Sequence, residues 1–251
     1  MIEKIKNKEK IVVLTAYDYS NAKLCEEAGV DIILVGDSLA MVFQGNEDTK
    51  SVKMEEMLYH TKAVARGAKK TLIIGDMPIN SYNTPELTLK NAKLFLEAGA
   101  HGVKIEGSKP EIISTLLKNN IPVMGHIGLL PQTAKQYKVQ GKDKESAEKL
   151  VKDARELDNL GVFTLILECI PTQLAKEITE STKCKTIGIG AGPHCNGQVL
   201  VINDMLGLYD KFTPKFVRKY ANLHDIIKEA INNYKKDVEE RKFPNENESY
   251  S

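Results

Sequence analysis

The chain has 251 residues, a length that one large domain still accommodates. Its formal net charge is +1, which gives no reason to expect a nucleic-acid partner. No apolar run reaches the roughly 18 residues that a transmembrane helix needs, so no membrane partner is expected either. The first ten residues are polar and Lys-rich, and the four cysteines contain no CxxC pair. We therefore expect a cytoplasmic protein with free thiols.

Short apolar runs alternate with amphipathic segments along the chain. The runs are rich in Ile, Val and Leu without polar alternation, which indicates parallel strands that are buried on both faces. An eighth strand is expected at Phe216–Tyr220, with Val199–Ile202 as the competing position. The seven clearer strands are predicted at Ile11–Ala16, Ile32–Val35, Leu72–Ile74, Gly102–Ile105, Pro122–Met124, Phe163–Leu167 and Thr186–Ile189.

The segments between these runs carry recognisable helix ends. Thr84 followed by Pro85 is typical of an N-cap with proline at the first helical position. The sequence from Ser108 to Glu111 matches a capping box. Glycines at the other ends of helices are expected to adopt the left-handed conformation that terminates a helix: Gly29, Gly99 and Gly161.

Repeated strand–helix units predict an α/β protein with a parallel sheet. Eight units would close a (β/α)8 TIM barrel, whereas fewer would indicate a doubly wound sheet. We predict the barrel, as a single catalytic domain over residues 1–251, because no linker divides the chain. The polar tail from about residue 245 is expected to fray.

Four acidic residues follow apolar strands directly, and in three cases a glycine stands seven or eight residues before the acid. In barrels and in open α/β sheets, the carboxyl ends of the strands are where active sites form. These acids are Asp37, Asp76, Glu106 and Glu168.

Any one of these acids could instead be a helix cap or an ordinary loop residue. Four carboxylates on one rim would repel each other, and burial without a partner would be costly. A divalent cation is the simplest compensation, and carboxylate oxygens suit Mg²⁺.

Two basic side chains extend this set. Lys104 lies two residues before Glu106, so strand periodicity places both on the same face. It could form an internal ion pair, hold a substrate carboxylate, or act as a Schiff-base nucleophile. His126, between Gly125 and Ile127, could line a pocket or be a structural histidine, and spacing does not decide between them.

Several ordered segments together resemble the ketopantoate hydroxymethyltransferase family over nearly the whole chain. Each segment alone is weak evidence for the family, but the whole set in this order is highly specific for it. The matching segments are Thr15–Asp18, Val35–Leu39, Val103–Gly107, Gly125–Gln132, Lys138–Gly141, Leu167–Pro171 and Gly188–Gly192.

This resemblance implies a Mg²⁺-dependent one-carbon transferase of pantothenate biosynthesis. The implied reaction moves a hydroxymethyl group from 5,10-methylenetetrahydrofolate to 3-methyl-2-oxobutanoate and gives 2-dehydropantoate, through an enolate that the metal stabilises. A homodecamer with one Mg²⁺ per subunit is also implied. Glu168 corresponds to the family's catalytic base. The implied metal ligands are Asp37, Asp76 and Glu106, and the implied substrate contacts are Asp37, Ser38, Asp76 and Lys104.

Three alternatives remain open at this point. A Mg²⁺-dependent lyase of the phosphoenolpyruvate mutase and isocitrate lyase type would use a similar barrel, but such enzymes usually carry a cysteine-bearing catalytic loop, which is not found in this sequence. An aldolase could use Lys104 as a Schiff-base nucleophile. A 2-oxo acid-binding protein without turnover would need no base at Glu168.

Overall fold

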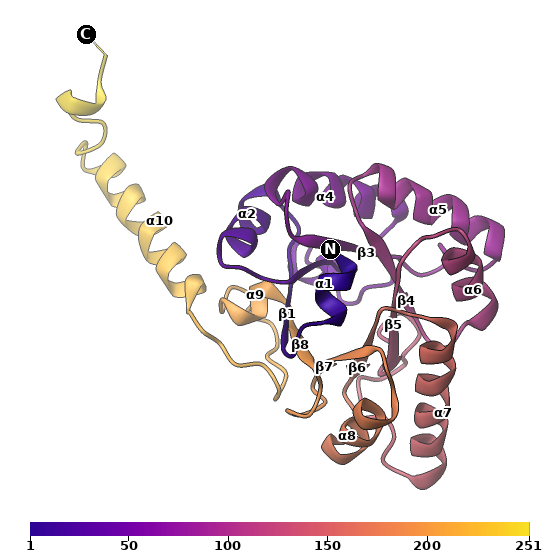
Figure 1. Ribbon diagram of the computed structural model, residues 1–251. Helices are drawn as coiled ribbons and strands as arrows, with labels where there is room; N and C mark the ends of the chain where they lie inside the picture. Colours follow the sequence, from indigo (N-terminus) through magenta and orange to yellow (C-terminus); the bar gives the residue numbers. More distant parts are fainter. Residues whose placement is uncertain (251) are drawn as a thin grey trace. The chain divides into compact units, whose positions relative to one another are not determined.

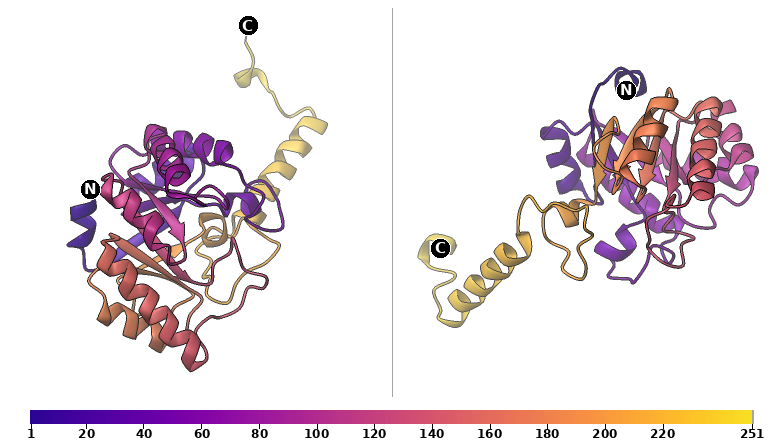
Figure 2. Two further views of the ribbon diagram at one scale, coloured as in Figure 1. Left: turned by 90° about the vertical axis from the view of Figure 1, so that its right-hand side faces the viewer. Right: turned by 90° about the horizontal axis from the view of Figure 1, so that it is seen from below.

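The computed structural model describes residues 1–250 and contains a closed barrel of eight parallel strands in sequential order, β1 to β8. The predicted (β/α)8 fold is therefore confirmed. Figure 1 shows helices α2, α4, α5, α6, α7 and α8 outside the ring of strands, and Figure 2 shows the same arrangement from two other sides. The strands are β1 (Ile11–Thr15), β2 (Ile32–Val35), β3 (Leu72–Asp76), β4 (Gly102–Glu106), β5 (Val123–Gly128), β6 (Thr164–Glu168), β7 (Lys185–Ile189) and β8 (Gly197–Leu200).

The helices begin and end largely where local chemistry predicts. Thr84 Oγ1 accepts a hydrogen bond from the Leu87 N–H and caps α5, as expected. The three predicted terminating glycines all have positive φ, which confirms their role. The helices are α1 (Ile2–Lys6), α2 (Tyr19–Glu27), α3 (Leu39–Val42), α4 (Met54–Gly67), α5 (Pro85–Glu97), α6 (Pro110–Lys118), α7 (Lys144–Leu160), α8 (Thr172–Ser181), α9 (Ile202–Met205), α10 (Leu223–Glu239) and the 3-10 turn η1 (Glu246–Glu248).

Two local predictions were wrong. The N-cap of α6 is Lys109, without a side-chain cap, because the Ser108 hydroxyl donates to Glu156 of α7 instead. The eighth strand does not lie at Phe216–Tyr220, which forms turns and irregular backbone. It is β8, which overlaps the competing position and pairs with both β1 and β7 to close the barrel.

The barrel interior is filled by side chains at alternate positions of the strands. Leu72 and Ile74 of β3 belong to this core, as do Met124 of β5 and Ile166 of β6. Because strand side chains alternate between faces, the next inward position along each of these three strands carries a polar residue, Asp76, His126 or Glu168. The apolar core thus supports a polar layer directly above it.

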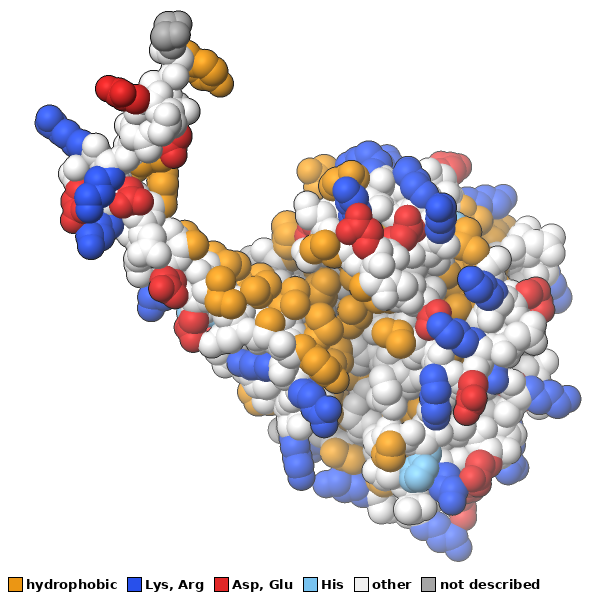
Figure 3. All heavy atoms as spheres, turned by 60° about the vertical axis from the view of Figure 1, so that its left-hand side comes forward, with side chains coloured by type: hydrophobic (Ala, Val, Ile, Leu, Met, Phe, Trp, Pro, Cys, Tyr) orange, Lys and Arg blue, Asp and Glu red, His pale blue; other side chains and the backbone are white. Residues whose placement is uncertain are grey.

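The chain separates into two compact units, Met1–Val201 and Ile202–Ser251. The first unit contains the complete barrel, and the prediction of a single domain stays a prediction. The second unit contains α10, which buries no residue and exposes Ile226, Ile231 and Tyr234 by more than half of their surface. Figure 3 shows apolar side chains on the surface of this unit, between charged ones. No helix in residues 1–250 is long and apolar enough to cross a membrane.

Candidate active site

The register of the barrel brings the predicted polar residues to one rim. Across neighbouring strands, Asp76 pairs with Lys104, and Glu106 pairs with His126. Glu168 ends β6 one strand further around. Asp37 follows β2, and its N–H donates to Asp76 Oδ2 at 3.3 Å. All four predicted carboxylates and both predicted basic residues therefore lie at the carboxyl end of the barrel.

Lys104 lies among three of these carboxylates. Its Nζ lies 2.9 Å from Asp76 Oδ2 and 3.3 Å from Glu106 Oε1, and all three side chains are at most 5% exposed. Burial lowers the pKa of Lys104, but the neighbouring carboxylates outweigh it and raise the pKa well above its usual value. The internal ion pair is confirmed. A Schiff-base nucleophile must be a free amine, so this arrangement disfavours that alternative.

The carboxyl groups differ in their preferred protonation state. Burial, together with the charge of Asp76, raises the pKa of Asp37 well above its usual value. Burial also raises the pKa of Asp76, whose Oδ1 is buried without a hydrogen-bond partner among the described residues. For Glu106, Lys104 and His126 overcome the effect of burial and lower the pKa to about 2. The site therefore gathers more carboxyl groups than its cations compensate, and two of them are shifted toward the neutral form.

His126 is buried between two carboxylates at 1% side-chain exposure. Its Nε2 lies 3.2 Å from Glu168 Oε2, and its Nδ1 lies 3.6 Å from Glu106 Oε1. Neither contact has the geometry of a hydrogen bond, so both are attractions between charged or polar groups. Burial and Lys104 oppose protonation, yet these two carboxylates raise the pKa of His126 to about 9. The imidazole is therefore part of the site, and its two carboxylate neighbours favour its protonated form.

Ser38 stands at the start of α3, directly after Asp37. Its Oγ lies 2.9 Å from the hydroxyl of Tyr17, which follows β1. The His60 imidazole contacts the Tyr17 carbonyl oxygen through Nδ1 at 2.6 Å, which fixes this part of the rim. The predicted contact of Ser38 with substrate stays a prediction.

The family model described as ketopantoate hydroxymethyltransferase matches residues 1–246. The chain belongs to the ketopantoate hydroxymethyltransferase family. It is 52% identical to the 3-methyl-2-oxobutanoate hydroxymethyltransferase of Syntrophomonas wolfei, over 99% of this chain and 93% of that protein. It is 48% identical to the enzyme of the same name from Caldicellulosiruptor saccharolyticus, over 100% of this chain and 97% of that protein.

Solved structures with a similar fold are far more distant in sequence. A 2,3-dimethylmalate lyase of the phosphoenolpyruvate mutase and isocitrate lyase superfamily aligns with a TM-score of 0.65 at 15% identity, over 94% of this chain and 87% of that one. A phosphonopyruvate hydrolase in complex with oxalate and Mg²⁺ aligns with a TM-score of 0.63 at 12% identity, over 98% and 90%. These likenesses show the barrel fold alone.

The donor chemistry at the rim fits a hard divalent cation. Three buried carboxylates can supply oxygen ligands, and one of their oxygens, Asp76 Oδ1, has no hydrogen-bond partner among the described residues. Within residues 1–250, no three acidic, His or Cys side chains are gathered closely enough to hold a metal by themselves. Mg²⁺ commonly uses only one or two protein carboxylates and completes its shell with water and substrate oxygens. The residues therefore fit Mg²⁺ without a preformed three-ligand cage.

Sequence reasoning assigned no role to Gln132, which the structure places at the centre of the site. Its side-chain Nε2 donates to Asp37 Oδ2 and to the Met77 carbonyl oxygen, each at 2.9 Å. Its backbone N–H donates to Glu106 Oε2 at 3.2 Å, and its Oε1 accepts a hydrogen bond from Tyr82. The segment Gly125–Gln132 contributed to the resemblance, but a residue on a loop has no periodicity that would reveal such contacts.

Proposed function

We propose that this protein transfers a hydroxymethyl group from 5,10-methylenetetrahydrofolate to 3-methyl-2-oxobutanoate and produces 2-dehydropantoate, the first step of pantothenate biosynthesis. Membership of the family and the names of its relatives support this reaction. The observation that carries the proposal is the buried group of Lys104, Asp76 and Glu106, with Glu168 beside it. In this group, Lys104 is a cation for a small anionic substrate, and Glu168 is a base for its proton.

Lys104 would hold the substrate carboxylate. Its ammonium is almost completely buried, and low solvent exposure strengthens its attraction for an anion. The neighbouring carboxylates keep it protonated, as this role requires. Asp37 and Ser38 would complete the contacts at the start of α3.

Glu168 would remove the C3 proton of the 2-oxo acid. Its side chain is 16% exposed, whereas the other three strand-end carboxylates are buried, so Glu168 is the most accessible of the four. Its neighbour His126 holds one carboxylate oxygen through charge attraction, so the carboxylate has a fixed position. The carbanion formed at C3 then attacks the methylene carbon of the donor. A carbon–carbon bond forms, and both carbon–nitrogen bonds of the donor's methylene carbon break, with one proton going to each nitrogen. Water supplies the new hydroxyl oxygen.

Mg²⁺, one per subunit, is proposed to bind through Asp37, Asp76 and Glu106. When bound, it supplies positive charge that stabilises negative charge developing on the 2-oxo group. The excess of buried carboxylates over cations at this rim supports the proposal.

Exchange of the substrate's C3 proton tests the proposed function. The protein is incubated with 3-methyl-2-oxobutanoate in D₂O, with Mg²⁺ or with EDTA, and the C3 proton is followed by NMR. We expect exchange with Mg²⁺ that EDTA suppresses. Absence of exchange, both alone and after addition of methylenetetrahydrofolate, would overturn the assignment.

We also propose that the protein works in the cytoplasm as a homodecamer. The exposed apolar residues of α10 support self-association, because a surface of this kind usually becomes covered by a partner. Light scattering after size exclusion should give ten times the chain mass of 27.9 kDa. A monomeric mass would contradict this assembly.

A further inference from the structure

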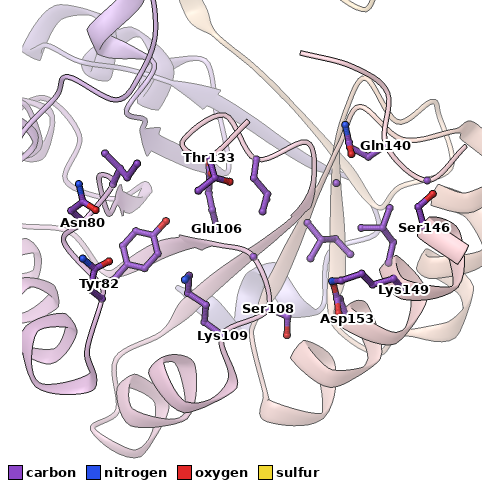
Figure 4. Close-up of a pocket in the computed structure, with 18 residues that line it drawn as sticks. Asn80, Tyr82, Glu106, Ser108, Lys109, Thr133, Gln140, Ser146, Lys149 and Asp153 are labelled. Carbon is purple, nitrogen blue, oxygen red and sulfur yellow. The ribbon is translucent and has the colours of Figure 1, made fainter. Parts of the chain in front are cut away.

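Gln132 lies on the loop after β5 and has no part in the proposed proton transfer. It is buried, at 1% exposure, and it contacts two of the three proposed metal ligands, Asp37 through its side chain and Glu106 through its backbone. The next residue, Thr133, lines one cavity together with Tyr82 and Glu106 (Figure 4). The loop therefore places an uncharged side chain against the carboxylates of the rim.

The hydrogen bonds of Gln132 fix which end of its amide faces Asp37. Its Nε2 donates to Asp37 Oδ2 and to the Met77 carbonyl oxygen, each at 2.9 Å, and its Oε1 accepts from the Tyr82 hydroxyl. A reversed amide would face the Met77 carbonyl with its oxygen, and a carbonyl cannot donate. Asp37 Oδ2 is therefore held against a hydrogen-bond donor.

Asp76 shows the same division between its two carboxylate oxygens. Its Oδ2 accepts from the Lys104 ammonium at 2.9 Å and from the Asp37 N–H at 3.3 Å, whereas its Oδ1 is buried without a hydrogen-bond partner among residues 1–250. At both aspartates, donors thus occupy Oδ2, which leaves Oδ1 as the oxygen for a cation. The two aspartates are therefore arranged to offer one oxygen each.

The number of oxygens that a carboxylate offers affects the choice of cation. Ca²⁺ takes roughly six to eight oxygen ligands at about 2.3–2.6 Å, and it often binds both oxygens of one carboxylate. Mg²⁺ requires a nearly octahedral shell at about 2.0–2.1 Å, and it keeps several waters beside one or two carboxylates. A rim whose aspartates each offer one oxygen therefore suits Mg²⁺ better than Ca²⁺.

We propose that Gln132 is a positioning residue that makes the rim selective for Mg²⁺ over Ca²⁺, because its amide keeps Asp37 Oδ2 out of the coordination shell. This inference deepens the proposed function and rests on its metal ligands. Lys104 restricts Asp76 in the same way, but its charge also opposes the binding of any cation. Since Gln132 is neutral, its replacement by another neutral residue tests selectivity without changing the charge of the site.

Competition between cations measures this selectivity in the full-length, metal-free protein without substrate. Mg²⁺ or Ca²⁺ displaces bound Mn²⁺, and the signal of free Mn²⁺ is followed by electron paramagnetic resonance. The ratio of the Ca²⁺ Kd to the Mg²⁺ Kd should exceed one in wild type. It should fall about tenfold in Gln132→Met, the lower end of what one hydrogen bond to a charged group contributes. A wild-type ratio of one or less would contradict the inference.

Two further variants separate the contact with Asp37 from general damage to the loop. Tyr82→Phe removes the hydroxyl that bonds Gln132 Oε1 but leaves the contact with Asp37, so its ratio should equal that of wild type. Gln132→Glu keeps the acceptor for Tyr82 and removes the donor to Asp37, so its ratio should fall, and it decides the matter if Gln132→Met does not fold. Unchanged ratios in the folded variants of position 132, or an equal fall in Tyr82→Phe, would overturn the role of Gln132.

This inference and the proposed function fail in different ways. If wild type exchanges the C3 proton with Mg²⁺ but position 132 leaves the ratio unchanged, the role of Gln132 is wrong and the proposed function stands. If substitution of Gln132 lowers the ratio but the C3 proton never exchanges, the selectivity stands and the proposed function fails. Mn²⁺ that does not bind wild type, or that Asp76→Asn does not release, would overturn both the proposed ligands and the role of Gln132.

Discussion

The imidazole of His126 and the carboxylate of Glu168 form a close pair, with Nε2 and Oε2 3.2 Å apart. The two residues come from adjacent strands, β5 and β6. His126 is buried and its pKa is raised to about 9, while Glu168 retains some exposure. Of the four strand-end carboxylates, Glu168 is therefore the one that reaches toward solvent, and the buried imidazole of His126 lies against it. This arrangement suits a catalytic base that must keep its position.

Glu168→Gln should abolish proton removal while preserving the shape of the site. We expect C3 exchange of 3-methyl-2-oxobutanoate to fall about 10²–10⁴-fold, the usual contribution of a general base. Binding of the 2-oxo acid should change little, because Lys104 is untouched. NMR exchange in D₂O and calorimetric titration measure the two quantities. Undiminished exchange would exclude Glu168 as the base.

The raised pKa of His126 predicts a pH-dependent stability in metal-free protein. Its pKa is about 9 in the folded chain against 6.5 ordinarily, so protonation favours folding. The stabilisation is complete below pH 6.5 and is lost as pH rises through about 9, with an upper size on the order of 3–4 kcal/mol. Urea unfolding at several pH values measures it.

His126→Asn is the control for this effect, because other groups also titrate near pH 9. The difference in unfolding free energy between wild type and variant should shrink as the pH rises from 6.5 to above about 9. A difference that stays constant with pH would show that His126 does not carry the effect.

The four strand-end carboxylates could be predicted because two simple patterns coincide. Apolar runs locate the strands, and the period of two along β4 places Lys104 and Glu106 on the same inward face. The strand ends that we predicted from hydrophobicity alone nevertheless came too early in several strands. In the structure, β3 continues to Asp76 and β4 continues to Glu106. The polar ends are strand residues because their backbones still pair with neighbours, although their side chains are not apolar.

The remaining features depend on tertiary contacts that leave no local pattern. Strand β8 has only four residues, and Gly197 and Gln198 interrupt its apolar character, so it becomes visible through pairing with β1 and β7. Gln132 acquires its role from a loop that returns over the rim. Its contacts with Asp37 span 95 residues of sequence, a separation that no window of periodicity covers.

Lys104→Met should destabilise the metal-free protein strongly. It would leave Asp76 and Glu106 buried without their cation, which typically costs about 3–5 kcal/mol. Mg²⁺ should recover part of this loss, because it supplies positive charge to the same carboxylates. Thermal unfolding with Mg²⁺ and with EDTA measures both effects. The exposed Lys118→Met should behave like wild type with Mg²⁺ and with EDTA. A Lys104→Met variant insensitive to Mg²⁺ would contradict the proposed ligands.

Gly128→Ala should disturb the end of β6. Gly128 has φ +98°, and an added Cβ would lie 2.2 Å from the Glu168 carbonyl oxygen. We expect a loss of more than about 2 kcal/mol in unfolding free energy, together with reduced exchange, because Glu168 must move. Gly107→Ala has a similar φ of +82° but would meet only Leu130, at 3.5 Å. If both variants lost the same stability, backbone strain and not the contact with Glu168 would be the cause.

Gln132 should couple the Tyr82 hydroxyl energetically to the carboxylate of Asp37. Gln132→Met removes the donor to Asp37 and the acceptor for the Tyr82 hydroxyl, whereas Tyr82→Phe removes that hydroxyl alone. We expect each change to lower the unfolding free energy by about 1–3 kcal/mol, since a buried polar partner is lost. The double variant should lose less than the sum of the two, by about 1 kcal/mol, because the hydrogen bond is shared. Denaturant unfolding of all four proteins gives this coupling, and strict additivity would show that Tyr82 and Gln132 act separately.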